Sequence, residues 1–287
     1  MNYALDALWW KLTHPAVRDL ASLLTAPPLW HSGAELSVRE LLGERGFRFL
    51  LALDAEPQPL ETFLAERAPF GRRLGLYAEA LLAFWFGHAP HAQLLAHNLQ
   101  VLSDGLTIGA ADFAVILNNK PYHIELTCKY YGCADGRTEN LCGLSRTDRL
   151  TAKAAKLPQQ LMLLKFPDGR RTVQQHGLPA DLQPVSIVRG MAFLPPHAPA
   201  ADAPLNPIAW RGTYVRGWAE HAFSPDKRYR PLERMAYLAP ARLPAAETLE
   251  AEAVQAAVQH GLVAELERRP DGFWHETARV MKVSDGL

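Results

Sequence analysis

The pattern of apolar and polar residues between positions 99 and 131 predicts three short β-strands joined by tight turns. Asp104-Gly105 separates the first strand from the second, and Asn118-Asn119-Lys120-Pro121 separates the second from the third. Residues 108–117 and 122–131, the second and third strands, are rich in β-branched and aromatic side chains. We expect the rest of the fold to be organised around this stretch.

The spacing of apolar residues predicts helices on both sides of these strands. The predicted helices cover residues 4–12, 17–24, 59–66, 74–86 and 146–164. Within the helix over 74–86, Glu79 is the only formal charge between Arg73 and His88. An isolated buried carboxylate is costly. Glu79 therefore lies either on a narrow solvent edge or beside a cation, as a third acidic ligand or a group that positions water.

The predicted helix over 146–164 carries an apolar stripe beside a polar one. The apolar stripe consists of Leu150, Ala154, Leu157, Leu161 and Leu164. The polar stripe consists of Arg146, Arg149, Lys153, Lys156 and Gln160. Ser145 and Asp148 resemble a capping box, and Pro158 is expected to kink or divide the helix after Leu157. The polar stripe is either a solvated face or a surface that binds a phosphate backbone.

The last third of the chain predicts smaller elements. Residues 185–194 predict a buried strand with a bulge or irregularity at Arg189-Gly190, and residues 195–207 predict a long loop or linker. Aromatic and basic residues are interleaved between 210 and 237. This mixture suits stacking on single-stranded nucleic acid, but we favour a small aromatic core with charged edges. A helix over 246–259 and a short strand over 277–283 follow.

Together these elements predict an α/β protein. A helical N-terminal extension covers residues 1–70, a core covers 71–195, and a C-terminal extension over 196–287 packs on that core as part of one compact unit. The 287 residues are 48% hydrophobic and 21% charged, which is typical of globular proteins.

The formal net charge is zero, so contact with nucleic acid would have to come from a local patch. Three cysteines, an odd number, argue against a disulfide framework and for a reducing compartment. The sequence has no run of eighteen apolar residues and no secretory signal pattern at its start. We therefore expect a cytoplasmic protein with no membrane contact.

Two acids stand out in the predicted hairpin, Asp112 in its first strand and Glu125 in its second. A two-residue turn places Asp112 opposite Glu125, whereas a four-residue loop places it opposite Thr127. Either loop leaves both carboxylates on one face, because side chains alternate along a strand. Facing Cβ atoms lie about 4.5–5.5 Å apart, at which two like charges repel. A divalent cation such as Mg²⁺ would turn that repulsion into a binding site.

His123, Thr127 and Lys129 share the face of Glu125. Paired carboxylates with a nearby lysine suit metal-assisted hydrolysis of a phosphodiester, in which the ammonium group stabilises charge or orients water. The alternative is a half-exposed hairpin whose acids and lysine lie in solvent.

The motif Gly109-x-x-Asp112 followed by Glu125-x-x-x-Lys129 resembles the PD-(D/E)XK nuclease-like superfamily. The longer strings TIGAADFAV, YHIELTCKYY and GLSRTDRLTAKAAKLPQQL resemble a bacterial family of unknown function placed within that superfamily. The resemblance implies a restriction-endonuclease-like fold with a four-stranded mixed sheet flanked by helices. It also implies that Asp112, Glu125 and the backbone carbonyl of Leu126 bind Mg²⁺ or Mn²⁺.

The chain departs from the common superfamily pattern at Thr127, where that pattern has lysine. Lys129 lies on the correct face but starts about 13 Å along the strand from Glu125. Lys153 is a candidate to replace the displaced lysine, and it and Gln160 are the helix residues that the resemblance places near the site. We therefore expect a metal-dependent nuclease acting on DNA or RNA. A nucleic-acid-binding protein that has lost catalysis is the alternative, and a purely structural partner protein is a weaker third hypothesis.

Overall fold

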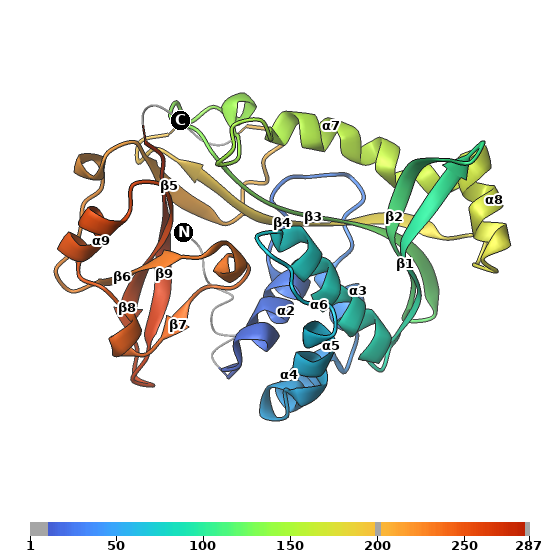
Figure 1. The fold of residues 1–287 in the computed structure, drawn as a ribbon, viewed down its shortest axis with the longest axis horizontal. Coiled ribbons are helices and arrows are strands. Elements are labelled where there is room, and N and C mark those ends of the chain that lie inside the picture. Colours follow the sequence, from blue (N-terminus) through green and yellow to red (C-terminus); the bar gives the residue numbers. More distant parts are fainter. Residues whose placement is uncertain (1–10, 199–201, 285–287) are drawn as a thin grey trace.

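The computed structural model describes residues 11–198 and 202–284 and shows one large mixed sheet with helices on both faces (Figure 1). Within these residues the sheet has nine strands, in the order β1-β2-β3-β4-β5-β9-β8-β6, with β7 paired to β9. The predicted α/β class with a mixed sheet flanked by helices is confirmed. The helix predicted over 4–12 lies almost entirely outside the described residues.

The first three strands form the predicted meander. They are β1 (Ala92–Ser103), β2 (Leu106–Leu117) and β3 (Lys120–Gly132). Two-residue turns join them, since Ser103 pairs with Leu106 and Leu117 pairs with Lys120. All four turn residues have positive φ, between 48° and 81°. Asn, Asp and Gly tolerate this conformation best, and their presence at these positions is the reason why the turns could be predicted from the sequence.

Strand β4 (Gln183–Leu194) lies parallel to β3. The predicted bulge at Arg189-Gly190 is wrong, because the register runs without a shift from Tyr122 opposite Gln183 to Gly132 opposite Phe193. Gly190 has a φ of 131°, and a Cβ atom there would lie 1.6 Å from the carbonyl oxygen of Lys129. Glycine is required by the close approach of the two backbones, and the pairing remains regular.

The sheet continues into the C-terminal part of the chain. Its further strands are β5 (Arg211–Val215), β6 (Arg228–Leu232), β7 (Arg242–Leu243), β8 (Gly261–Arg268) and β9 (Trp274–Lys282). Strand β5 is parallel to β4 and to β9, with three residue pairs on each side. The strand predicted over 277–283 is the end of the longer β9. Strands β5, β6, β7 and β8 were not predicted, and the helix predicted over 246–259 is shortened to α9 (Ala251–Ala257).

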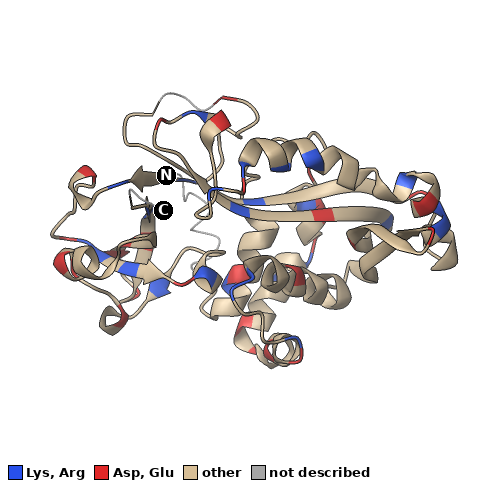
Figure 2. Cartoon of the chain, turned by 45° about the horizontal axis from the view of Figure 1, so that its top comes forward, with Lys and Arg blue, Asp and Glu red and all other residues tan. Residues whose placement is uncertain are grey.

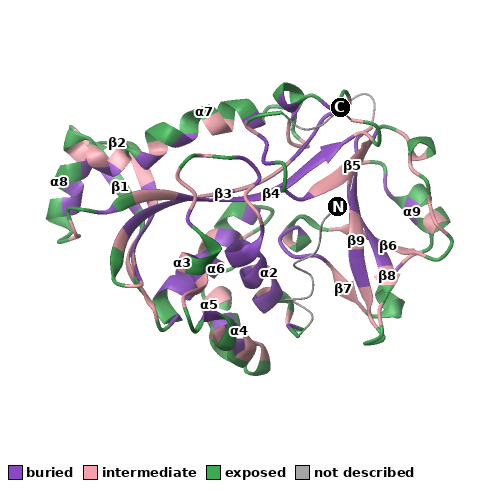
Figure 3. Ribbon diagram, turned by 180° about the vertical axis from the view of Figure 1, so that it is seen from behind, coloured by how far each residue is buried: buried purple, intermediate pink, exposed green. Residues whose placement is uncertain are grey.

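The N-terminal helices cover one face of the sheet (Figure 1). They are α2 (Pro15–Thr25), α3 (Val38–Leu42), α4 (Gly46–Ala55), α5 (Gln58–Ala65) and α6 (Leu74–His88). Helix α6 is apolar around most of its circumference because it packs against β1–β3 on one side and α2 and α5 on the other. The buried positions concentrate on this helix and on the inner strands (Figure 3).

The opposite face of the sheet carries α7 (Leu150–Leu161), followed by a 3₁₀ turn (Leu163–Lys165) and α8 (Pro167–Gln175). The predicted apolar stripe is confirmed, since its leucines are buried and Ala154 is half-buried. The predicted start at residue 146 is wrong. The chain from Cys142 to Arg149 instead forms a loop closed by a bridge between those two residues. Helix α7 continues through Pro158 to Leu161 without division.

Short 3₁₀ turns complete the secondary structure of the described residues. They are Thr138–Asn140, Trp218–Glu220, Arg234–Ala236 and Ala245–Glu247. Three of the interleaved aromatic residues form a packed cluster, in which the ring of Phe223 lies 5.4 Å from Trp218 and 5.0 Å from Tyr229, and the others pack in or against the main core. This confirms the aromatic core that we favoured over base stacking.

Helix α2 is attached to the C-terminal half of the chain by polar contacts. The Ser22 hydroxyl donates to the carbonyl oxygen of Leu238 at 2.6 Å. The Asp19 carboxylate accepts the backbone N–H of Ala239 at 3.0 Å, and Arg18 donates to the carbonyl oxygen of Pro240 at 3.0 Å. These contacts fix the helical layer to the segment that precedes β7.

Candidate functional site

The register of the second hairpin brings the two predicted acids together. Backbone pairing of β2 and β3 reaches Phe113 opposite Ile124, so the next facing pair is Asp112 and Glu125. The two-residue turn is thus confirmed over the four-residue alternative. At Asp112 the side chain replaces the backbone as the link between strands, because its Oδ2 accepts the N–H of Leu126 at 2.8 Å.

Glu125 is deeply buried, with 1% of its surface exposed. Its Oε1 accepts a hydrogen bond from Nε2 of His123 at 2.9 Å, and its Oε2 accepts one from Nε2 of Gln160 at 3.2 Å. The amide oxygen of Gln160 in turn accepts a hydrogen bond from Nζ of Lys153 at 3.2 Å. A hydrogen-bonded chain therefore connects the central strand to α7.

The charge of Glu125 acts on two neighbouring carboxyl groups, those of Asp112 and Glu79. Burial, followed by the charge of Glu125, raises the pKa of Asp112 from 3.8 to about 7. Glu79 on α6 raises that pKa further, while the Leu126 N–H and Lys153 lower it. The pKa of Glu79 is itself raised, first by burial and then by Glu125. Negative charge is therefore unfavourable here unless a cation balances it.

The two candidate lysines have different partners. Lys129 Nζ donates to the Asp148 carboxylate at 2.6 Å, and the Tyr131 hydroxyl donates to the same carboxylate at 3.0 Å. Asp148 is thus bound to the strand and does not cap the helix, contrary to the capping box that we predicted. Burial and the charge of Lys129 lower the pKa of Lys153. The charges of Asp112 and Glu125 act in the opposite direction and raise it. Of the two candidate lysines, Lys153 is therefore the one that interacts electrostatically with both acids.

Thr127 stands where the superfamily pattern has lysine. It is 3% exposed, and its Oγ1 has no hydrogen-bond partner in the part of the chain that the structure describes. On the strand it lies between Glu125 and Lys129, on the same face. An unpaired buried hydroxyl beside buried acids is a polar position that a ligand or water could satisfy.

The predicted polar stripe is divided between the helix and the preceding loop. Lys153 and Gln160 are half-buried and face the acids, whereas Lys156 is exposed on α7. Arg146 and Arg149 are exposed on the loop before the helix. Basic positions along α7 lie above acidic positions on the strands in Figure 2. The alternation of side chains predicts His123 on this face, but its hydrogen bond to Glu125 was not predicted.

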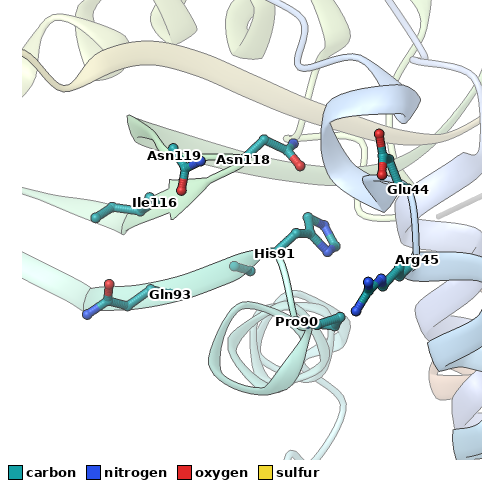
Figure 4. Close-up of a pocket in the computed structure, with 9 residues that line it drawn as sticks. Glu44, Arg45, Pro90, His91, Gln93, Ile116, Asn118 and Asn119 are labelled. Atoms are coloured by element: carbon teal, nitrogen blue, oxygen red, sulfur yellow. The ribbon is translucent and has the colours of Figure 1, made fainter.

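A separate pocket of ≈ 570 Å³ lies at the Asn118-Asn119 turn, beside the loop that carries Glu44 and Arg45 (Figure 4). His91 lines this pocket and donates a hydrogen bond from Nε2 to the carbonyl oxygen of Leu41 at 2.9 Å. None of the three interacting acids lines it. This pocket is therefore distinct from the carboxylate site.

The donor set at the carboxylate site suits a hard cation. Asp112 and Glu125 supply oxygen atoms from facing positions. The carbonyl of Leu126 points to the same strand edge as its N–H, and hence toward Asp112. Mg²⁺ is commonly held by one or two carboxylates, with water completing its shell. Among residues 11–198 and 202–284, no three His, Cys, Asp or Glu side chains form a group that could hold a metal ion.

No helix in the described ranges is both long enough and apolar enough to cross a bilayer. Comparison with known proteins gives no match among curated proteins or among solved structures. A family model described as a domain of unknown function (DUF1853) matches residues 18–283, which include every strand and helix described above except the first residues of α2. Since this match spans most of the chain, the protein belongs to the DUF1853 family.

Proposed function

We propose that this protein hydrolyses phosphodiester bonds of nucleic acid with the help of Mg²⁺ or Mn²⁺. The observation that carries the proposal is the facing pair Asp112 and Glu125, in which the charge of one acid raises the pKa of the other. Buried like charges are costly to fold around, and a bound cation offsets that cost.

The arrangement of the surrounding elements supports the proposal. Strands β1–β4 form a mixed four-stranded unit, with α6 on one face and α7 on the other. A four-stranded mixed sheet flanked by helices is the arrangement that the resemblance to the restriction-endonuclease-like fold leads us to expect. The acids lie on its two inner strands, and Lys153 and Gln160 reach them from the helix that follows β3.

Within the proposed site the residues have separate roles. Asp112, Glu125 and the Leu126 carbonyl would hold the metal ion, which when bound polarises a phosphoryl oxygen and lowers the pKa of water. Gln160 and His123 fix the orientation of the Glu125 carboxylate. The Lys153 ammonium group would stabilise negative charge on the phosphate. Glu79 would position water or support the cation from α6.

A second candidate function is nucleic-acid binding without hydrolysis. Two observations favour it: threonine replaces the motif lysine at position 127, and both carboxylate oxygens of Glu125 already accept hydrogen bonds within the protein. In that case the basic residues Arg146, Arg149, Lys153 and Lys156 would bind the phosphate backbone, and the acids would not support turnover.

Isothermal titration calorimetry with MgCl₂ and with MnCl₂ tests the site, using wild type, Asp112→Asn and Glu125→Gln. Glu139→Gln, which removes an exposed acid, is the matched control. We expect wild type and the control to bind the ion and the two site variants to lose binding. Cleavage of mixed DNA and RNA substrates then tests turnover. Metal binding without cleavage would favour the second function, and no metal binding would refute the first.

A further inference from the structure

A polar groove of ≈ 540 Å³ lies at the carboxyl end of β3, away from the buried acids. One wall is the loop between β3 and α7, which contributes Asp135, Arg146 and Arg149. The other wall is the end of β5, which contributes Tyr214 and the following Arg216. An adjoining pocket of ≈ 270 Å³ shares Tyr214 and Arg216, so the groove extends along the end of the strand.

The loop that carries two of these arginines has a defined shape. Gly132 forms a bridge with Cys142, and Cys142 forms another with Arg149. The N–H of Gly143 donates to the carbonyl oxygen of Asp148 at 2.8 Å. Arg146, at the tip of the loop, has a positive φ of 57°. The two arginines are thus held on an ordered hairpin-like loop at the groove.

The groove carries excess positive charge. Arg146 and Arg149 are exposed, and neither forms an ion pair with any described residue. The groove contains one acid, Asp135, whose carboxylate accepts hydrogen bonds from the N–H of Arg137 and the side chain of Asn140. The adjoining pocket adds Glu220, which accepts the backbone N–H of Arg216 at 3.1 Å. Both acids are therefore engaged by the protein itself.

The groove is connected to the carboxylate site along β3. Lys129 and Tyr131 bind Asp148, which lies in the loop between the two arginines. Gly132 at the groove lies seven residues beyond Glu125 in the same strand, a span of about 23 Å. Lys129 is half-exposed between them. Lys129, paired with Asp148, therefore lies on the path from the acids to the groove.

We propose that this groove binds the phosphate backbone of the substrate strand on one side of the bond that is cleaved. The inference rests on the proposed function, and it adds a length requirement. At about 3.4 Å per nucleotide in a stacked strand, the span of about 23 Å corresponds to roughly seven nucleotides. An oligonucleotide of four nucleotides bound at the acids cannot reach the groove, whereas one of sixteen can.

Fluorescence anisotropy with oligonucleotides of four and sixteen nucleotides tests this proposal over a series of salt concentrations, in EDTA and in MgCl₂. The test variant is Arg146→Gln with Arg149→Gln, and the matched control is Arg170→Gln with Arg171→Gln, two exposed arginines of α8. The test variant should bind the 16-mer about tenfold more weakly, with a salt slope reduced by about 1–2. Its affinity for the 4-mer should equal that of wild type.

Circular dichroism and thermal unfolding establish that both variants fold. Equal affinity of wild type and test variant for the 16-mer would overturn the groove while leaving the proposed function intact. An equal loss of affinity for both lengths, or an equal loss in the α8 control, would overturn it as well. If wild type binds neither oligonucleotide, the proposed function and the groove both fail.

Discussion

Replacing Asp112 by Asn is expected to stabilise the metal-free protein and to abolish stabilisation by Mg²⁺. The amide oxygen of Asn can still accept the N–H of Leu126, so the link between β2 and β3 is retained. What the substitution removes is a buried negative charge that faces Glu125 and Glu79. A change at a functional site that raises stability is the opposite of what loss of a structural contact would produce.

The magnitude follows from the pKa of Asp112, which is raised from 3.8 to about 7. Well below pH 4 the carboxyl group is protonated in both folded and unfolded states and has no effect on stability. As the pH rises from 4 to 7, the unfolded state loses its proton first, so the folded state becomes relatively less stable. The full difference corresponds to about 4 kcal/mol. Solvent screening of the partly exposed group reduces this to about 1–3 kcal/mol.

Thermal unfolding of wild type, Asp112→Asn and the exposed-site control Asp226→Asn measures the effect. At pH 8 in EDTA, we expect the Tm of Asp112→Asn to exceed that of wild type by about 2–10 °C, and the two to converge near pH 4. Added MgCl₂ should raise the Tm of wild type and of the control only. A lower Tm for Asp112→Asn at pH 8, or equal stabilisation of all three by MgCl₂, would refute the reasoning.

Further substitutions test other parts of the structure. Lys153→Met should reduce the rate of cleavage about 10²-fold or more. Lys129→Met should mainly disturb the loop that the ion pair with Asp148 holds, and a larger loss of turnover in this variant than in Lys153→Met would reverse these roles. Gly190→Ala should destabilise the fold by more than about 4 kcal/mol, because the Cβ atom of the alanine would overlap a carbonyl oxygen of β3. The effect should be seen as loss of soluble protein or as loss of the cooperative unfolding transition in urea. Asn119→Gly should raise the free energy of unfolding, measured by urea titration, by a few tenths of a kcal/mol to about 1 kcal/mol, because glycine adopts the positive φ of 65° more readily than asparagine. A fall in stability would contradict the turn assignment.

The central hairpin could be predicted because its determinants are local. Asn118 and Asn119 specify the tight turn, and the alternation of side chains then fixes which face each acid occupies. The spacing of apolar residues likewise predicts helix α6 and the buried stripe of α7 without reference to distant parts of the chain. Local pattern was therefore sufficient for the sheet core and for the juxtaposition of Asp112 and Glu125.

Features that depend on distant partners could not be predicted. Asp148 looks like a helix cap in the sequence, but Lys129 and Tyr131 of β3 bind its carboxylate, and the helix begins later. Residues 261–268 mix apolar and charged side chains, and their pairing with β6 and β9 makes them a strand. A glycine within a predicted strand indicates a bulge when the sequence is considered alone. The reason for Gly190 is instead the close approach of the backbone of Lys129, which lies far away in the sequence.

The narrow connection at β5 has a consequence for work with fragments. This strand of five residues is the only element that continues the sheet from β4 to β9 among the described residues. A fragment ending near residue 195 would leave Ala192–Leu194, at the end of β4, without the strand that they pair with, and such unpaired backbone groups invite association between molecules. It would also remove the carbonyl groups that Arg18 and Ser22 of α2 bind. Expressing the N-terminal fragment alone is therefore expected to yield aggregates, and both halves have to be kept in any truncation study.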